Sequence, residues 1–108
     1  MANKKNKTKS APKILKVILE DGTIIQEKTA TETYVEAIRQ LGPYGISQIE
    51  NIKVEGLPLV VSKKDYRMQL REVNENWYVA THMATDAKKR MLEKVAEALN
   101  VKITIEIK

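Results

Sequence analysis

A turn signal near the start of the chain constrains the fold more than any other feature of the sequence. Asp21-Gly22 separates two β-rich runs, residues 13–20 and 23–28. An Asp-Gly pair tolerates the positive φ angles that both central positions of a type I′ turn require, so it predicts a hairpin with a two-residue loop. The fold should therefore begin with two antiparallel strands.

A two-residue loop also predicts which side chains share a face of this hairpin. It places Leu19 opposite Ile24 and Ile18 opposite Ile25, with Lys16 opposite Glu27 on the second face. The first face carries Leu15, Val17, Leu19 and Ile24, and the second carries Ile14, Ile18 and Ile25. Both faces are partly apolar, which indicates that helices cover one face and that something else partly covers the other.

Two segments have a helical hydrophobic period. Thr29 to Glu32 has the pattern of a capping box, and the helix that it opens ends at Gly42-Pro43. The second helix spans residues 85–100, with Thr85 as the expected N-cap and Asn100 at its carboxyl end. Each helix presents one apolar stripe, so each is expected to pack on a sheet.

The remaining segments favour strands. Residues 66–72 and 77–83 alternate on either side of a turn at 74–76 and predict a second hairpin, and residues 101–108 alternate regularly. Residues 43–64 are harder to interpret, although Pro58 favours an edge strand or a strand start there. The order predicts an α+β fold, a mainly antiparallel sheet of five or six strands with two amphipathic helices on one face.

The positive charge of the chain is concentrated in its first twelve residues. Nineteen Lys and Arg face fourteen Asp and Glu, but Lys4, Lys5, Lys7 and Lys9 have no acidic neighbour, so residues 13–108 carry fifteen basic against fourteen acidic side chains. We expect residues 1–12 to be a disordered basic tail and residues 13–108 to be a single domain. Without cysteine or a long apolar run, a soluble cytoplasmic protein is expected, with no membrane partner.

The sequence offers little catalytic chemistry. The four glycines form no phosphate loop, and one histidine without any cysteine makes a structural zinc site improbable. The serines do not sit in a strained elbow where His82 could activate one of them. We therefore expect neither an enzyme nor a bound metal or cofactor.

Local groups suggest binding instead. Thr81, His82 and Thr85 cluster beside the expected start of the second helix, where free amides attract anions; in the alternative interpretation, Thr85 is an ordinary N-cap and the nearby lysines are a solvated face. Trp77 and Tyr78 next to basic side chains could form a platform for single-stranded nucleic acid, although Trp77 also suits the core. The candidate nucleic-acid-binding residues are Lys4, Lys5, Lys7, Lys9, Lys63, Lys64, Arg67, Arg71, Lys88, Lys89 and Arg90.

The arrangement of these segments resembles a small uncharacterised bacterial module found in restriction and mobile-element neighbourhoods, as in Bacteroidetes. The resemblance rests on the Asp-Gly hairpin, on residues 30–42 and 56–60, and on Trp77 to His82 leading into a Lys-rich helix. In that pattern small hydroxyl residues commonly follow Thr-His, whereas this chain has Met83-Ala84. The resemblance implies a context in phage, plasmid or phage-defence biology and assigns no activity.

The sequence thus favours a non-catalytic interaction domain that serves as an accessory in nucleic-acid binding, with the basic tail contacting phosphates. The main alternative is a protein-binding module, such as a small phage or mobile-element factor that inhibits or adapts a host protein. Its expected interface is Ile14, Ile18 and Ile25 or an unpaired sheet edge. A homodimer is a third alternative, because the regular terminal strand could pair with its own copy.

Overall fold

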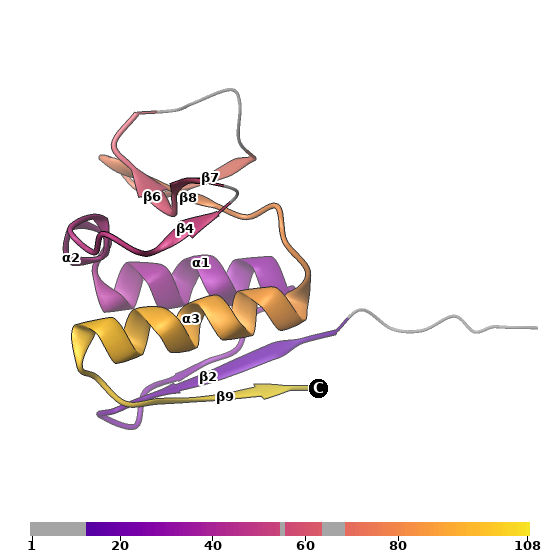
Figure 1. The fold of residues 1–108 in the computed structure, drawn as a ribbon. Helices are drawn as coiled ribbons and strands as arrows, with labels where there is room; N and C mark the ends of the chain where they lie inside the picture. Colours follow the sequence, from indigo (N-terminus) through magenta and orange to yellow (C-terminus); the bar gives the residue numbers. More distant parts are fainter. Residues whose placement is uncertain (1–12, 55, 64–68) are drawn as a thin grey trace, which may run out of the picture.

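The computed structural model describes residues 13–54, 56–63 and 69–108. The α+β class is confirmed, and the described strands are divided among three small sheets instead of one. Figure 1 shows the two long helices in a middle layer, with one three-stranded sheet on each side of them. The predicted basic tail at residues 1–12 lies outside the described residues.

The first sheet joins the two ends of the described chain. Its strands are β2 (Leu15–Leu19), β3 (Ile24–Ile25) and β9 (Ile103–Ile107), in the antiparallel order β3-β2-β9. Its inner face packs Leu15 and Val17, both fully buried, against the helices. The central position of β2 is the reason that its inward side chains reach the core.

The register predicted for the first hairpin is wrong by one residue. Val17 pairs with Ile25 and Ile18 pairs with Ile24, across a loop of three residues. Among the described non-glycine residues only Asn100 has a positive φ, so the Asp-Gly pair cannot form a type I′ turn. Instead Gly22, at φ +92°, donates its N–H to the Leu19 carbonyl at 2.9 Å, as in a turn followed by a left-handed glycine.

This shift of register exchanges the roles of two neighbouring isoleucines. Ile25 is 4% exposed and belongs to the core, whereas Ile24 is 60% exposed on the opposite face. The predicted interface residue Ile25 is therefore an interior residue, because side chains alternate between the two faces of a strand. Ile24 takes its place beside Ile18.

The helix boundaries follow local signals. Helix α1 (Ala30–Leu41) begins at Thr29, whose hydroxyl accepts the Glu32 N–H at 3.1 Å, and ends at Gly42, as the sequence predicts. A short helix α2 (Pro43–Ser47) follows at once. Helix α3 (Thr85–Leu99) ends at Asn100 in the left-handed conformation, but its N-cap is Ala84, so the prediction of Thr85 as the N-cap is wrong.

The remaining strands form two further sheets. Strands β4 (Lys53–Val54) and β5 (Leu57–Pro58) make a two-stranded sheet, so Pro58 lies on an edge strand, which is one of the two places predicted for it. Strands β6 (Val60–Val61), β7 (Leu70–Asn74) and β8 (Trp77–Ala80) form an antiparallel sheet in the order β6-β8-β7. Because this sheet lies across the helices from the first, the two sheets do not merge.

Helix α1 is hydrogen-bonded to the second sheet and to the segment that follows β3. Its fully buried Tyr34 donates its hydroxyl to the Ala80 carbonyl of β8 at 2.9 Å, and Arg39 Nε donates to the Val73 carbonyl of β7 at 2.8 Å. On the other side, the Thr33 hydroxyl accepts the Glu27 N–H at 2.8 Å. None of the described helices is long and apolar enough to cross a bilayer.

Candidate functional site

The outer face of the first sheet carries three isoleucines, of which Ile24 is exposed and Ile14 and Ile18 are half-buried. Ile14, Ile18 and Ile24, which we call the isoleucine face, lie on the side of β2 and β3 that is turned away from α1 and α3. In Figure 1 no described element lies against this side of the sheet. Ile24 is one of two large apolar residues described as exposed; the other, Tyr44, is on α2.

Charged and polar residues complete this face. Lys16 of β2 lies opposite Glu106 of β9, and Ile18 lies opposite Thr104. Opposite charges at a directly paired position offset each other, so the face has no excess of either sign there. The prediction that Ile14 and Ile18 share one face agrees with the register, and only the third residue of the set changes.

Strand β9 also presents an unpaired edge. One side of β9 pairs with β2 over five positions, and no described strand pairs with its other side. A hollow of about 500 Å³ lies beside this edge, between β9 and α3. It is lined by Glu93, Ala96, Glu97, Val101, Lys102, Ile103 and Thr104. The alternating pattern of residues 101–108 predicts the strand, but it does not indicate which side of the strand stays unpaired.

Within the described residues, the predicted basic side chains do not gather into one surface. Lys88 is only 5% exposed, and its ammonium donates to the carbonyls of Thr81 at 3.1 Å and Met83 at 2.5 Å. It also lies 5.8 Å from the centroid of the Tyr34 ring. Burial lowers the pKa of Lys88, because the charged form loses hydration. Contrary to the sequence-based prediction, Lys88 is a buried residue whose ammonium binds two backbone carbonyls of the protein, and it is not exposed to bind a phosphate.

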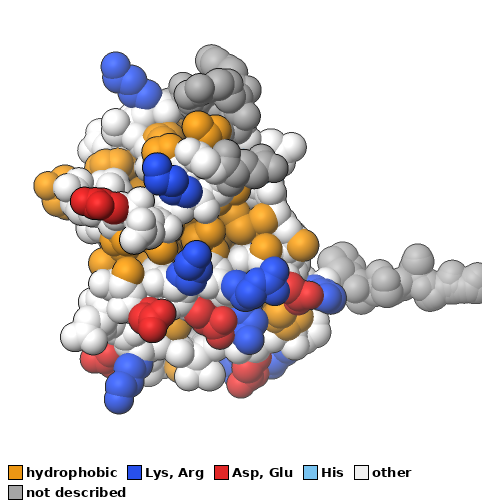
Figure 2. Space-filling view, in the orientation of Figure 1, with side chains coloured by type: hydrophobic (Ala, Val, Ile, Leu, Met, Phe, Trp, Pro, Cys, Tyr) orange, Lys and Arg blue, Asp and Glu red, His pale blue; other side chains and the backbone are white. Residues whose placement is uncertain are grey.

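Neighbouring basic residues on α3 face acids. Lys89 pairs with Glu93 at 3.5 Å, and Asp86 pairs with Lys13 at 3.5 Å. Arg90 is exposed, as is Lys63 after β6. On the face shown in Figure 2, Lys and Arg are interspersed with Asp and Glu and form no continuous basic area. Lys4, Lys5, Lys7, Lys9, Lys64 and Arg67 lie outside the described residues.

The segment predicted to bind an anion is largely occupied by internal hydrogen bonds. The Thr81 N–H donates to the Gln69 carbonyl at 3.0 Å, and the Met83 N–H donates to the Thr81 carbonyl at 2.8 Å. His82 and Thr85 are half-buried. The nearest described cation, Lys88, is engaged by carbonyls of this segment. An anion site at Thr81, His82 and Thr85 remains a prediction that the geometry does not favour.

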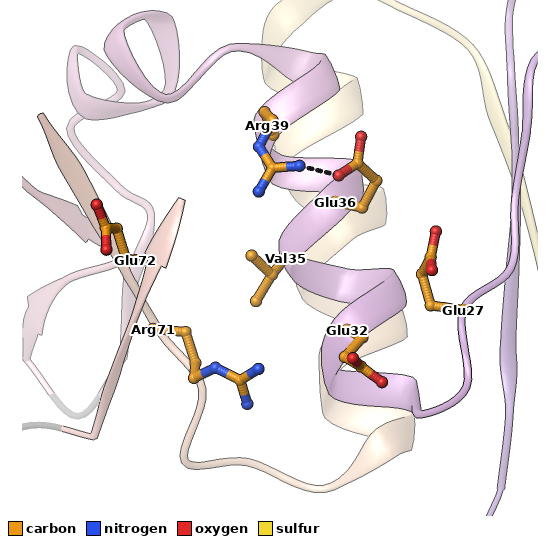
Figure 3. Close-up of a pocket in the computed structure, with 7 residues that line it drawn as sticks. All are labelled: Glu27, Glu32, Val35, Glu36, Arg39, Arg71 and Glu72. Carbon is orange, nitrogen blue, oxygen red and sulfur yellow. Dashed lines mark hydrogen bonds and ion pairs between the residues drawn. The ribbon is translucent and has the colours of Figure 1, made fainter. Parts of the chain in front are cut away.

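Arg71 lies in a mixed-charge groove. The groove has a volume of about 260 Å³ and is lined by Glu27, Glu32, Val35, Glu36, Arg39, Arg71 and Glu72. Figure 3 shows the Arg71 side chain directed from β7 toward α1, while Arg39 is paired with Glu36. Four carboxylates and two guanidinium groups line the groove, so it does not suit a polyanion.

The predicted aromatic platform is also divided. Trp77 packs edge-to-face against Tyr44 of α2, with ring centroids 6.3 Å apart. Tyr78 is the next residue of β8, and successive residues of a strand point to opposite faces. The two rings therefore do not form one stacking surface with Arg71.

Metal-binding groups do not gather in the described part of the chain. Within residues 13–54, 56–63 and 69–108, no three or more His, Asp or Glu side chains lie close enough together to hold a metal ion. Comparison with protein-family models, with curated proteins and with solved structures finds no match.

Proposed function

We propose that this chain is a non-catalytic protein-interaction domain that binds its partner through the isoleucine face. The observation that carries the proposal is the 60% exposure of Ile24 beside Ile18, on the side of the first sheet that no described helix covers. Exposed apolar side chains grouped on one face are a common mark of a protein-binding surface. On the opposite face of the same sheet, Leu15, Val17, Ile25 and Ile105 are buried and no described apolar residue is exposed, so this exposure is specific to one side.

The charges on this face favour a protein as the partner. Lys16 lies between Ile14 and Ile18 on β2 and is paired with Glu106 of β9, and the opposite signs of this pair give no net attraction for phosphates. A matching surface would present apolar side chains to the isoleucines and polar or charged groups to the Lys16–Glu106 pair. Such a mixture is typical of protein–protein interfaces.

Affinity capture with a single substitution tests this proposal. Ile24→Gln should remove the apolar contact without adding charge, whereas Tyr44→Gln changes the other described exposed apolar residue, which lies on α2. A partner captured from the native host by the unaltered chain should be lost with Ile24→Gln, retained with Tyr44→Gln and unaffected by nuclease. Equal capture by both variants, with unchanged urea midpoints, would rule out the isoleucine face.

The basic tail supports a second candidate function, accessory binding of nucleic acid in the mobile-element context that the resemblance implies. The supporting observation is that Lys4, Lys5, Lys7 and Lys9 have no acidic residue among the first twelve. Four phosphate contacts on duplex DNA would give a slope of about −3.6 for the logarithm of affinity against the logarithm of salt. Anisotropy with labelled DNA should lose this slope when residues 2–12 are deleted, and unchanged binding would reject the role of the tail.

A further inference from the structure

The unpaired edge of β9 has the properties of a strand that pairs with another strand. It has five residues without proline, and three of them are isoleucines. Edge strands in monomeric proteins are commonly protected by proline, inward charges or a covering element. In Figure 1 β9 lies at the margin of the first sheet with α3 running above it.

The hydrogen bonds to β2 show which groups of β9 face outward. Ile14 and Lys108 exchange two bonds, of 3.2 and 2.8 Å, so the polar backbone groups of Lys108 point toward β2. Because this direction alternates along an antiparallel strand, Thr104 and Glu106 also point toward β2. Ile103, Ile105 and Ile107 therefore turn their N–H and C=O groups toward the open edge.

A second copy of β9 can satisfy these groups in an antiparallel pair around a two-fold axis. Ile103, Ile105 and Ile107 must then pair with odd-numbered residues of the second copy, which leaves a small set of symmetric registers. An axis at Thr104 places Lys102 of each copy opposite Glu106 of the other, which gives two pairs of opposite charge. It also places Ile103 of each copy opposite Ile105 of the other. An axis at Ile105 instead sets Lys102 against Lys108, and an axis at Glu106 sets two glutamates together. Directly opposed like charges are destabilising, so the axis at Thr104 is favoured over these two registers.

The hollow beside α3 fits the same register. Directly paired residues of an antiparallel sheet share a face. Ile105 and Ile107 of the second copy would therefore lie opposite Ile103 and Val101, on the side of the sheet that faces α3. That side holds the hollow of about 500 Å³, whose lining includes Ala96, Val101 and Ile103. The half-buried Ile103 and Ile107 would thereby become interior residues.

We propose that the chain forms a homodimer in which two β9 strands pair antiparallel with Thr104 on the two-fold axis. The two first sheets then become one continuous sheet of six strands. Both isoleucine faces lie on the same side of it, since the axis is perpendicular to the sheet. The dimer offers two copies of the proposed binding surface side by side, but its formation does not depend on what that surface binds.

A cysteine scan tests the register directly, because the chain contains no cysteine. At the axis, Thr104 forms a pair without mutual backbone bonds, with Cα atoms about 4.5 Å apart, which is within disulfide range. Thr104→Cys should cross-link into a covalent dimer under oxidised glutathione. Lys102→Cys and Glu106→Cys are the matched controls on the same face, and each should remain largely uncross-linked because its copy lies four residues away along the pair.

Light scattering and sedimentation supply the second measurement. The unaltered chain should have twice its monomer mass of 12.3 kDa at micromolar concentration. Thr104→Lys places two ammonium groups together at the axis and should raise the dissociation constant at least tenfold with an unchanged circular dichroism spectrum. A monomer at high micromolar concentration would overturn the dimer, and cross-linking by Glu106→Cys in preference to Thr104→Cys would overturn the register. Either result leaves the Ile24→Gln capture experiment unaffected.

Discussion

The hydroxyl of Tyr34 provides a stringent test of how the helix layer is joined to the second sheet. Tyr34 is 0% exposed and donates to the Ala80 carbonyl at 2.9 Å. Tyr34→Phe keeps the ring and removes only this donor. The substitution therefore isolates one buried hydrogen bond between α1 and β8.

The expected loss follows from the burial of both groups. A neutral intramolecular hydrogen bond contributes about 1 kcal/mol, and a buried acceptor left without a donor costs about 1–3 kcal/mol. We expect Tyr34→Phe to lower the free energy of unfolding by about 2 kcal/mol at pH 7. In a domain of this size such a change lowers the melting temperature by roughly 10 °C.

The loss should depend on pH in a specific direction. Burial raises the pKa of Tyr34 above its usual value, because the phenolate would lose its hydration. The protonated hydroxyl thus stabilises the folded state fully below pH 10, and this contribution declines as the pH rises above the unfolded pKa of about 10. At pH 11 the difference between the unaltered chain and Tyr34→Phe should shrink by about 1.4 kcal/mol.

Urea denaturation at pH 7 and pH 11 measures both effects. Trp77, the single tryptophan, reports unfolding by fluorescence. Tyr44→Phe is the matched control, because Tyr44 is 66% exposed and its change should stay within about 0.5 kcal/mol. The reasoning fails if Tyr34→Phe costs no more than Tyr44→Phe, or if its cost is the same at both pH values.

Two further substitutions test other features by the same urea assay. Lys88→Ala leaves two loop carbonyls without their charged donor and should lower the free energy of unfolding by about 3 kcal/mol. Arg90 is exposed, so the control Arg90→Ala should lower it by less than about 0.5 kcal/mol. Equal losses would contradict the internal role of Lys88. Gly22→Ala should destabilise the folded state by about 1 kcal/mol, because φ is +92° at this position even though no atom obstructs a Cβ. Gly45→Ala in helix α2 should instead stabilise the folded state by about 0.5 kcal/mol. A gain of stability with Gly22→Ala would contradict the left-handed conformation of the loop.

Several features that depend on neighbouring residues are predictable from the sequence, although the N-cap of α3 is Ala84 and not Thr85. Thr29 caps α1, Gly42 ends it and Asn100 ends α3, because caps form between groups a few residues apart. The α+β class follows from the change between the two hydrophobic periods. These signals need no knowledge of the rest of the fold.

Features that depend on distant residues or on small loop differences are not predictable in the same way. Asp21-Gly22 suits both a two-residue and a three-residue loop, and that difference decides whether Ile24 or Ile25 is buried. Lys88 has the spacing of a solvated helix residue, yet the carbonyls of Thr81 and Met83 draw its ammonium inside. The isoleucine face could therefore be predicted only in part from the sequence.

The pairing of β2 with β9 has a consequence for the order of folding. Lys102 donates its N–H to the Glu20 side chain across a separation of 82 residues, and the same two strands form the core of the first sheet. Closing so long a loop costs chain entropy before the sheet can contribute stability, so domains rich in such contacts fold slowly. During synthesis, β2 can pair with β3, but its other edge stays unpaired until β9 has left the ribosome. Over that interval the hairpin of β2 and β3 leaves open the sheet edge that β9 closes in the finished fold.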